Sequence, residues 1–209
     1  MKRAVTRTLL VAAGALAFAL APSGADAGRV TAVTPARASA DVTLNISATG
    51  LDPNAASNRV TFTPQGGAAV GALALNVGTV DAAAGVRRIG VRVPRGLPAG
   101  PVALRVTNLA SGEVTEAGTI QLVALEVIPA SLAQGAGPAD IVIRSSPNGQ
   151  FAAAGTRAVF GAGVTVHSLR VDSPTQVTVS VSVSATAPVG RLTVATLTSG
   201  QTAYAPEGF

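Results

Sequence analysis

The sequence contains no cysteine among its 209 residues. Without thiols the chain can have no disulfide framework, no thiolate metal site and no cysteine nucleophile. A bacterial lipid-anchor signal also needs a cysteine at its cleavage site, so lipoprotein anchoring is excluded. We therefore expect the folded parts of the chain to be held together by burial of their hydrophobic cores alone.

Aromatic and basic side chains are also scarce. Aromatics make up 3% of the residues, tryptophan is absent, and Tyr204 is the single tyrosine. The formal net charge is +5, but Lys2, Arg3, Arg7 and Asp26 lie in the N-terminal segment; the remainder has 12 basic and 9 acidic residues, a net charge of +3. A nucleic-acid-binding surface usually clusters basic residues and often adds stacking aromatics, so the composition argues against nucleic acid as a partner.

The N-terminal segment has the pattern of a secretory signal peptide over residues 1–27. A basic start is followed by an apolar run from Leu9 to Leu20, by Pro22, and by Ala25-Asp26-Ala27 before Gly28. The apolar run is about 12 residues long, shorter than the roughly 20 that span a bilayer as a helix. The sequence therefore predicts an exported protein that begins near Gly28 after cleavage, is periplasmic or extracellular, and has no membrane span.

The rest of the chain contains one internal repeat. Matched segments recur at offsets of about 90 residues, a length typical of one small β-sandwich. The pairs are Val33-Thr34-Pro35 with Val127-Ile128-Pro129, Val60-Thr61-Phe62 with Ala158-Val159-Phe160, Val91-Arg92-Val93-Pro94 with Val179-Ser180-Val181-Ser182, and Ser111-Gly112 with Ser199-Gly200. The repeat predicts two tandem domains, at residues 28–124 and 125–209.

Within each copy the local pattern indicates β-strands. The segments 42–47 and 177–183 alternate apolar and polar residues, which places valine on one face and hydroxyls on the other. Turn signals such as Pro64-Gln65-Gly66-Gly67 separate the short runs. One short helical turn is expected at residues 80–84, ended by Gly85, and no flexible linker separates the copies around Val123. The fold class predicted is all-β, with two tandem immunoglobulin-like β-sandwiches after a signal peptide.

The second copy resembles the bacterial immunoglobulin-like repeats related to the TIG/IPT group. The residues that carry the resemblance are Ile128-Pro129-Ala130-Ser131, Gln134-Gly135, Asp140-Ile141-Val142-Ile143, residues 158–166, Pro188-Val189-Gly190 and Pro206-Glu207-Gly208-Phe209. The first copy is a looser match, through Val60-Thr61-Phe62, Val93-Pro94 and Leu97-Pro98-Ala99-Gly100. The resemblance implies a sandwich fold found in extracellular and surface proteins, and it implies no catalytic residues.

The sequence offers few groups for catalysis or metal binding. His167 is the only histidine, and Ser168 and Asp172 nearby lie on a predicted strand where adjacent side chains point to opposite faces. Asp52, Asn54 and Asn58 could supply oxygen ligands to a calcium ion, but these residue types are equally ordinary in turns. We predict no enzyme activity, no cofactor and no metal.

Arginines 87, 88, 92 and 95 form the densest charge cluster. On a strand, Arg88 and Arg92 share one face, while Ile89, Val91 and Val93 take the other. The two arginines are therefore the candidate ligand-binding residues, for an anionic polymer or glycan. They are also consistent with a solvated sheet face that discourages edge pairing.

Two functions remain open on this sequence. The first is a non-catalytic module for structural spacing, adhesion or protein docking, with an envelope or extracellular protein as its partner. The second is a module that binds a glycan or an anionic polymer. Stacking of sugars on an aromatic platform is limited to Tyr204, because the chain has no other tyrosine and no tryptophan.

Overall fold

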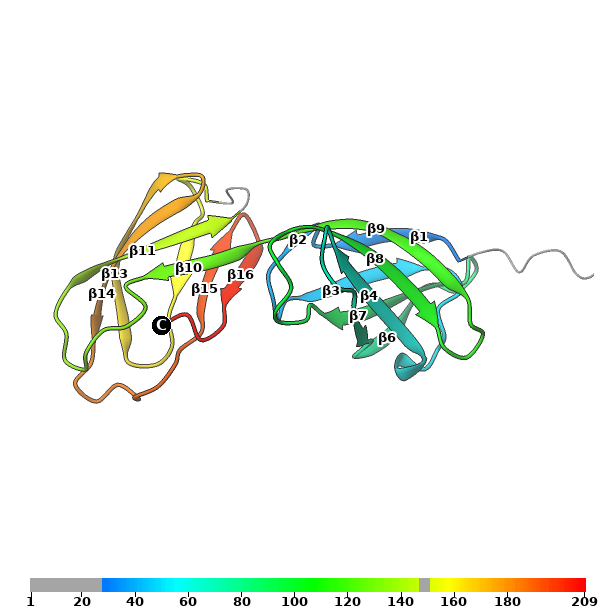
Figure 1. Cartoon of the computed structure of the whole chain (residues 1–209), viewed down its shortest axis with the longest axis horizontal. Coiled ribbons are helices and arrows are strands. Elements are labelled where there is room, and N and C mark those ends of the chain that lie inside the picture. The colour runs from blue at the N-terminus through cyan, green and yellow to red at the C-terminus, as the bar shows by residue number, and fades with distance from the viewer. Residues whose placement is uncertain (1–27, 147–150) are drawn as a thin grey trace, which may run out of the picture.

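A computed structural model describes residues 28–146 and 151–209 of the chain. Nearly all of the regular structure is β-strand, and Figure 1 shows the strands gathered into two lobes. The part described contains no helix long and apolar enough to cross a membrane. The expected signal peptide at residues 1–27 lies outside the described residues.

The N-terminal lobe, residues 28–122, consists of two sheets. The first has the order β1-β3-β7-β6, with β1 Val30–Thr34, β3 Thr43–Ala48, β7 Val86–Arg92 and β6 Asn76–Asp81. The second has the order β2-β9-β8-β4-β5, with β2 Arg37–Ala38, β9 Val114–Leu122, β8 Gly100–Asn108, β4 Asn58–Pro64 and β5 Val70–Leu73. All pairs are antiparallel except β2 with β9, which is parallel.

The C-terminal lobe, residues 124–209, also consists of two antiparallel sheets. The first has the order β10-β11-β14-β13, with β10 Ala124–Ile128, β11 Ala139–Ser146, β14 Gln176–Val183 and β13 Val164–Ser173. The second has the order β12-β15-β16, with β12 Arg157–Val159, β15 Val194–Thr198 and β16 Gln201–Ala205.

The two lobes repeat one strand order. Taken along the chain, β1, β3, β6 and β7 occupy the places that β10, β11, β13 and β14 occupy in the second lobe, and β9-β8-β4 corresponds to β16-β15-β12. The segments matched in the sequence fall at these corresponding places: residues 60–62 lie in β4, and the match at 158–160 begins in β12. The β8–β9 and β15–β16 turns carry the matched Ser-Gly pairs.

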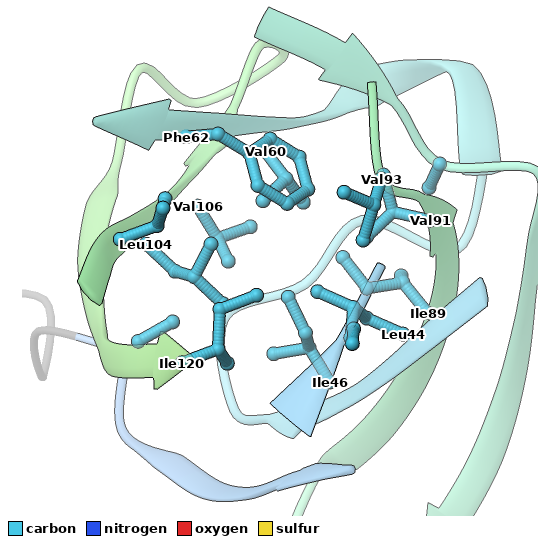
Figure 2. Close-up of a cluster of buried hydrophobic side chains, with 14 of the residues drawn as sticks. Leu44, Ile46, Val60, Phe62, Ile89, Val91, Val93, Leu104, Val106 and Ile120 are labelled. Atoms are coloured by element: carbon cyan, nitrogen blue, oxygen red, sulfur yellow. The ribbon is translucent and has the colours of Figure 1, made fainter. Parts of the chain in front are cut away.

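Each lobe has its own hydrophobic core. In the N-terminal lobe, the buried side chains of β3 and β7 face those of β4, β8 and β9, as Figure 2 shows for Leu44, Ile89 and Phe62. In the C-terminal lobe, valines 177, 179, 181 and 183 of β14 are buried and alternate with half-buried polar residues. The alternation predicted for residues 177–183 is therefore confirmed, because the side chains of successive strand residues point to opposite faces. In β3 the predicted alternation holds through Ile46, but Ser47 is buried as well.

The junction between the lobes is one residue long. Val123 alone separates β9 from β10, it is buried, and its backbone N–H donates to the carbonyl of Ala38. The backbone N–H of Tyr204 in β16 donates to the Ser39 hydroxyl across the junction, at 2.7 Å. Apolar side chains of both lobes, including Leu97 and Pro206, line the gap between them. No flexible spacer separates the lobes, as the sequence predicted.

The short helical turn expected at residues 80–84 is wrong. β6 continues to Asp81, and the Asp81 carboxylate then accepts the backbone N–H groups of Ala83 and Ala84, which closes the β6–β7 hairpin turn. A local side-chain acceptor of this kind competes with helix formation. Within residues 28–146 and 151–209, a short 3-10 turn lies instead at Ala55–Ser57, after Asn54.

Candidate functional site

The two predicted ligand-binding arginines share one face of β7 but have different surroundings. Both are exposed, and the buried Gly90 lies midway between them. Arg88 Nε donates to the Ser47 hydroxyl on β3, at 3.3 Å. Arg92 lies opposite Thr43 at the end of the strand nearest the junction. Four residues along a strand span ~13 Å, so the two guanidinium groups do not form one compact site.

Arg92 lies in a cleft between the two lobes. The cleft has a volume of about 490 Å³, within the range of ~300–1,000 Å³ that is common for ligand pockets. Its N-terminal wall comes from the β1–β3 connection, β3 and β7, and its C-terminal wall comes from the β15–β16 hairpin. The lining residues are Pro35, Asp41, Val42, Thr43, Arg92, Gly200, Gln201, Thr202 and Tyr204.

The acidic residue of the cleft is already paired. Asp41 Oδ2 lies 2.7 Å from Arg95 Nε. Arg95 Nη1 lies 3.5 Å from Glu207 Oε1, and Glu207 Oε2 lies 3.0 Å from Arg191 Nη1. These four charges therefore form a neutral chain that runs from the first lobe to the second. Because the two arginines and Glu207 are exposed and Asp41 is half-buried, screening by water keeps each pair weak.

Arg92 differs from its charged neighbours because its guanidinium has no hydrogen bond or ion pair within residues 28–146 and 151–209. It is the one unpaired charge among the residues that line the cleft. Thr43, Gln201, Thr202 and Tyr204, which also line the cleft, carry hydroxyl or amide groups. This combination can bind a small anion that also carries hydrogen-bonding groups, because guanidinium donors form strong bonds with carboxylates.

His167 does not join a catalytic constellation with the residues that the sequence suggested. It is exposed at a bulge in β13, and its Nε2 lies 2.9 Å from the Ser182 hydroxyl. The Asp172 carboxylate instead accepts hydrogen bonds from Thr178, Gln176 and Arg170. These hydrogen bonds, led by that of Thr178, together with the nearby Arg170 charge, lower the pKa of Asp172.

The oxygen-bearing loop at residues 52–58 is a structured turn. Asp52 Oδ1 accepts the backbone N–H of Asn54, and Asn54 Oδ1 accepts that of Ala56. The Asn58 side chain accepts the N–H of Asp52 and donates to two backbone carbonyls of the same loop. The side-chain oxygens hold the loop closed, and no group of three acidic, histidine or cysteine residues in the described part of the chain could hold a metal ion.

A second hollow lies at the far end of the C-terminal lobe. It has a volume of about 360 Å³ and is bordered by the β10–β11 and β14–β15 connections and by Phe209. Val189 on its rim is 87% exposed, and the ring of Phe209 packs edge-on against Phe160 below. The lining is largely apolar, with Gln134 held by the carbonyl of Ala187.

The sequence identified Arg92 but could not identify the cleft. Residues 200–204 lie more than a hundred positions from Arg92, and the geometry of the junction brings them together. Tyr204 was singled out only as the single tyrosine. Ser39, which accepts the hydrogen bond from the Tyr204 N–H across the junction, could not be identified from the sequence, because an isolated serine before a strand is ordinary.

No protein-family model matches this chain, and a search of curated proteins finds no similar sequence.

Proposed function

We propose that the protein is an exported, non-catalytic module of two tandem immunoglobulin-like β-sandwich domains, which spaces, displays or docks another envelope or extracellular protein. The observation that carries the proposal is the same strand order in both lobes, joined by a one-residue junction with direct contacts across it.

The immunoglobulin-like character is supported by connectivity. With the strands lettered along each lobe, one sheet has the order A-B-E-D and the other contains G-F-C, which is the arrangement of the constant-type immunoglobulin fold. β2 of the first lobe adds a short parallel partner to β9, and β5 extends the same sheet beyond β4. The TIG/IPT-like resemblance of the sequence agrees with this arrangement, and it remains a proposal.

A spacing role follows from the junction. A covalent connection of one residue leaves little freedom, and the buried Val123 and Ser39 fix the adjoining strands on both sides. Such a pair of lobes would hold its two ends at a set separation, whereas a flexible linker would let them move independently.

Export is supported by residues 1–27 and by the absence of cysteine, which makes folding independent of the redox state of the compartment. Cell fractionation followed by N-terminal sequencing tests it. We expect the mature protein outside the cytoplasm, beginning near Gly28. A cytoplasmic protein with its first residues intact would contradict export.

The docking role is tested by crosslinking in intact cells followed by purification of the protein. We expect an envelope or extracellular protein to be crosslinked repeatedly, and deletion of the gene to impair assembly of that partner at the surface. No crosslinked protein together with unchanged surface assembly would refute the docking role.

A second candidate function is binding of a glycan or anionic ligand. One specific observation favours it: the predicted ligand-binding residue Arg92 is unpaired and lines a polar cleft between the lobes. Arg88, by contrast, is held by Ser47 and lies outside that cleft.

A further inference from the structure

We infer that the cleft between the lobes binds an acidic saccharide, with the carboxylate of a uronic acid on Arg92 and the sugar hydroxyls on the polar residues around it. The inference rests on the second candidate function above, and names the ligand class and the site. It leaves the spacing and docking role untouched.

The charge of the cleft selects a single carboxylate. Arg92 supplies one unpaired positive charge, while the neighbouring Asp41 is negative and is neutralised by Arg95. Phosphate places up to two negative charges on one centre and would need a second cation beside Arg92, whereas a disaccharide of uronic acids carries its second carboxylate on the other ring, away from the one that Arg92 binds. A carboxylate matches one guanidinium in both charge and planar shape, because two N–H groups can donate to its two oxygens.

The uncharged lining suits sugar hydroxyls. Thr43 and Thr202 each provide a hydroxyl that can donate and accept, and the Gln201 amide provides both kinds of group. Pro35 and Val42 add apolar surface for the C–H groups of a sugar ring, and Tyr204, the single tyrosine of the chain, is also part of the lining. A volume of about 490 Å³ can hold a short saccharide.

An acidic peptide fits this cleft less well than a saccharide. A peptide gains much of its affinity by pairing its backbone with a free strand edge. In β16, which forms the C-terminal wall, the backbone N–H of Tyr204 is already bonded to the Ser39 hydroxyl. Apart from Arg92 and Asp41, the polar side chains of the cleft carry hydroxyls and an amide, which match the hydroxyls of a sugar.

The cleft exists only while the lobes keep their relative position. Residues 35–43 and Arg92 come from the first lobe, and residues 200–204 come from the second. A ligand that touches both walls would therefore bind to one arrangement of the lobes. This predicts that signals from both lobes respond to the same ligand with the same dissociation constant.

The test is titration of the purified, isotope-labelled protein with α-1,4-digalacturonate, followed by the backbone amide signals in NMR spectra. Neutral α-1,4-galactobiose is the matched control for charge, and inorganic phosphate tests whether any anion suffices. We expect digalacturonate to shift the amide signals of Thr43, Gln201 and Thr202 together, with a dissociation constant in the millimolar range. Galactobiose and phosphate should bind at least about tenfold more weakly.

Two matched variants test whether Arg92 supplies the positive charge that binds the carboxylate. Arg92→Gln should weaken digalacturonate binding at least about tenfold, since it removes the charge-assisted bonds. Arg88→Gln, which changes the same residue type on the same face of β7, should leave binding unchanged. Retained signal dispersion in both variants shows that they are folded.

The inference is overturned if digalacturonate causes no shifts at tens of millimolar. It is also overturned if galactobiose or phosphate binds equally well, or if Arg92→Gln binds like the unmodified protein. Because the wild-type comparison of the probes needs no variant, a variant that failed to fold would leave the test intact. None of these results bears on the crosslinking test of docking.

Discussion

The substitution Phe62→Ala tests whether the two lobes have separate cores. Phe62 is the largest fully buried side chain in the described part of the chain, with 0% of its surface exposed, and it lies on β4 in the N-terminal core. Truncation of a buried phenylalanine to alanine typically costs about 3–5 kcal/mol, through lost burial and the cavity left behind. A small domain is stable by only about 5–15 kcal/mol, so the change removes a large part of that stability.

The expected result is confined to one lobe. With a urea dependence of about 2 kcal/mol per molar, the unfolding midpoint of the N-terminal lobe should fall by about 2 M. Hydrogen–deuterium exchange read by mass spectrometry assigns the loss to peptides. Protection should fall in β3, β4, β7 and β8 and persist in β11 and β14, whose buried side chains belong to the other core.

The matched control is Leu75→Ala in the same lobe, where the side chain is 56% exposed. It should shift the midpoint by a small fraction of the Phe62→Ala effect, because little apolar surface is lost. Equal loss of protection in β11 and β14 of the Phe62→Ala variant would refute the reasoning, because it would show one cooperative core where the structure has two.

Substitutions at Ser39, Gly163 and Asp172 each perturb one local feature of the fold. Ser39→Ala removes the acceptor of the Tyr204 N–H and leaves that group without a partner, which costs about 1–3 kcal/mol. Spin labels on the two lobes should then give a broader distance distribution. An unchanged distribution would show that this bond does not hold the junction. Gly163→Ala places a Cβ 2.5 Å from another side chain at a φ of +83°, whereas the Cβ of the control Gly112→Ala, at a φ of +76°, meets nothing within 4 Å. Thermal melts should show a clearly larger loss of stability for Gly163→Ala. Equal melting temperatures of the two variants would contradict the clash. Asp172→Asn removes a carboxylate whose pKa is lowered on folding, so the variant should be less stable at neutral pH, and the difference should vanish as the pH falls through the folded pKa. Urea unfolding at pH 7 and pH 2.5 measures the difference in the free energy of unfolding. An equal difference at both pH values would contradict the direction of the pKa shift.

The strands were predictable from the sequence because each depends on local alternation. In β14 the period-two pattern of valine and hydroxyl residues fixes which side chains enter the core, and the structure buries those valines. The repeat was predictable for a related reason, since matched segments mark corresponding strands and turns. Both features follow from residues that are close in sequence.

The cleft was not predictable, because it depends on the packing of one lobe against the other. Alternation placed Arg88 and Arg92 on one face, as observed, but it could not show that Ser47 holds Arg88 while Arg92 faces the β15–β16 hairpin. The expected helical turn at residues 80–84 failed for a local reason. The Asp81 carboxylate bonds to backbone N–H groups just beyond it and stabilises a hairpin turn.

If the short junction holds the two lobes in one arrangement, a single distance separates them, and one distance measurement tests this directly. Because the chain has no cysteine, Ala110→Cys and Ser168→Cys place one spin label on each lobe without background. Pulsed electron spin resonance should give a single narrow distance distribution that 0.5 M salt leaves unchanged, since screening weakens only the exposed ion pairs. A broad or multiple distribution would contradict the account.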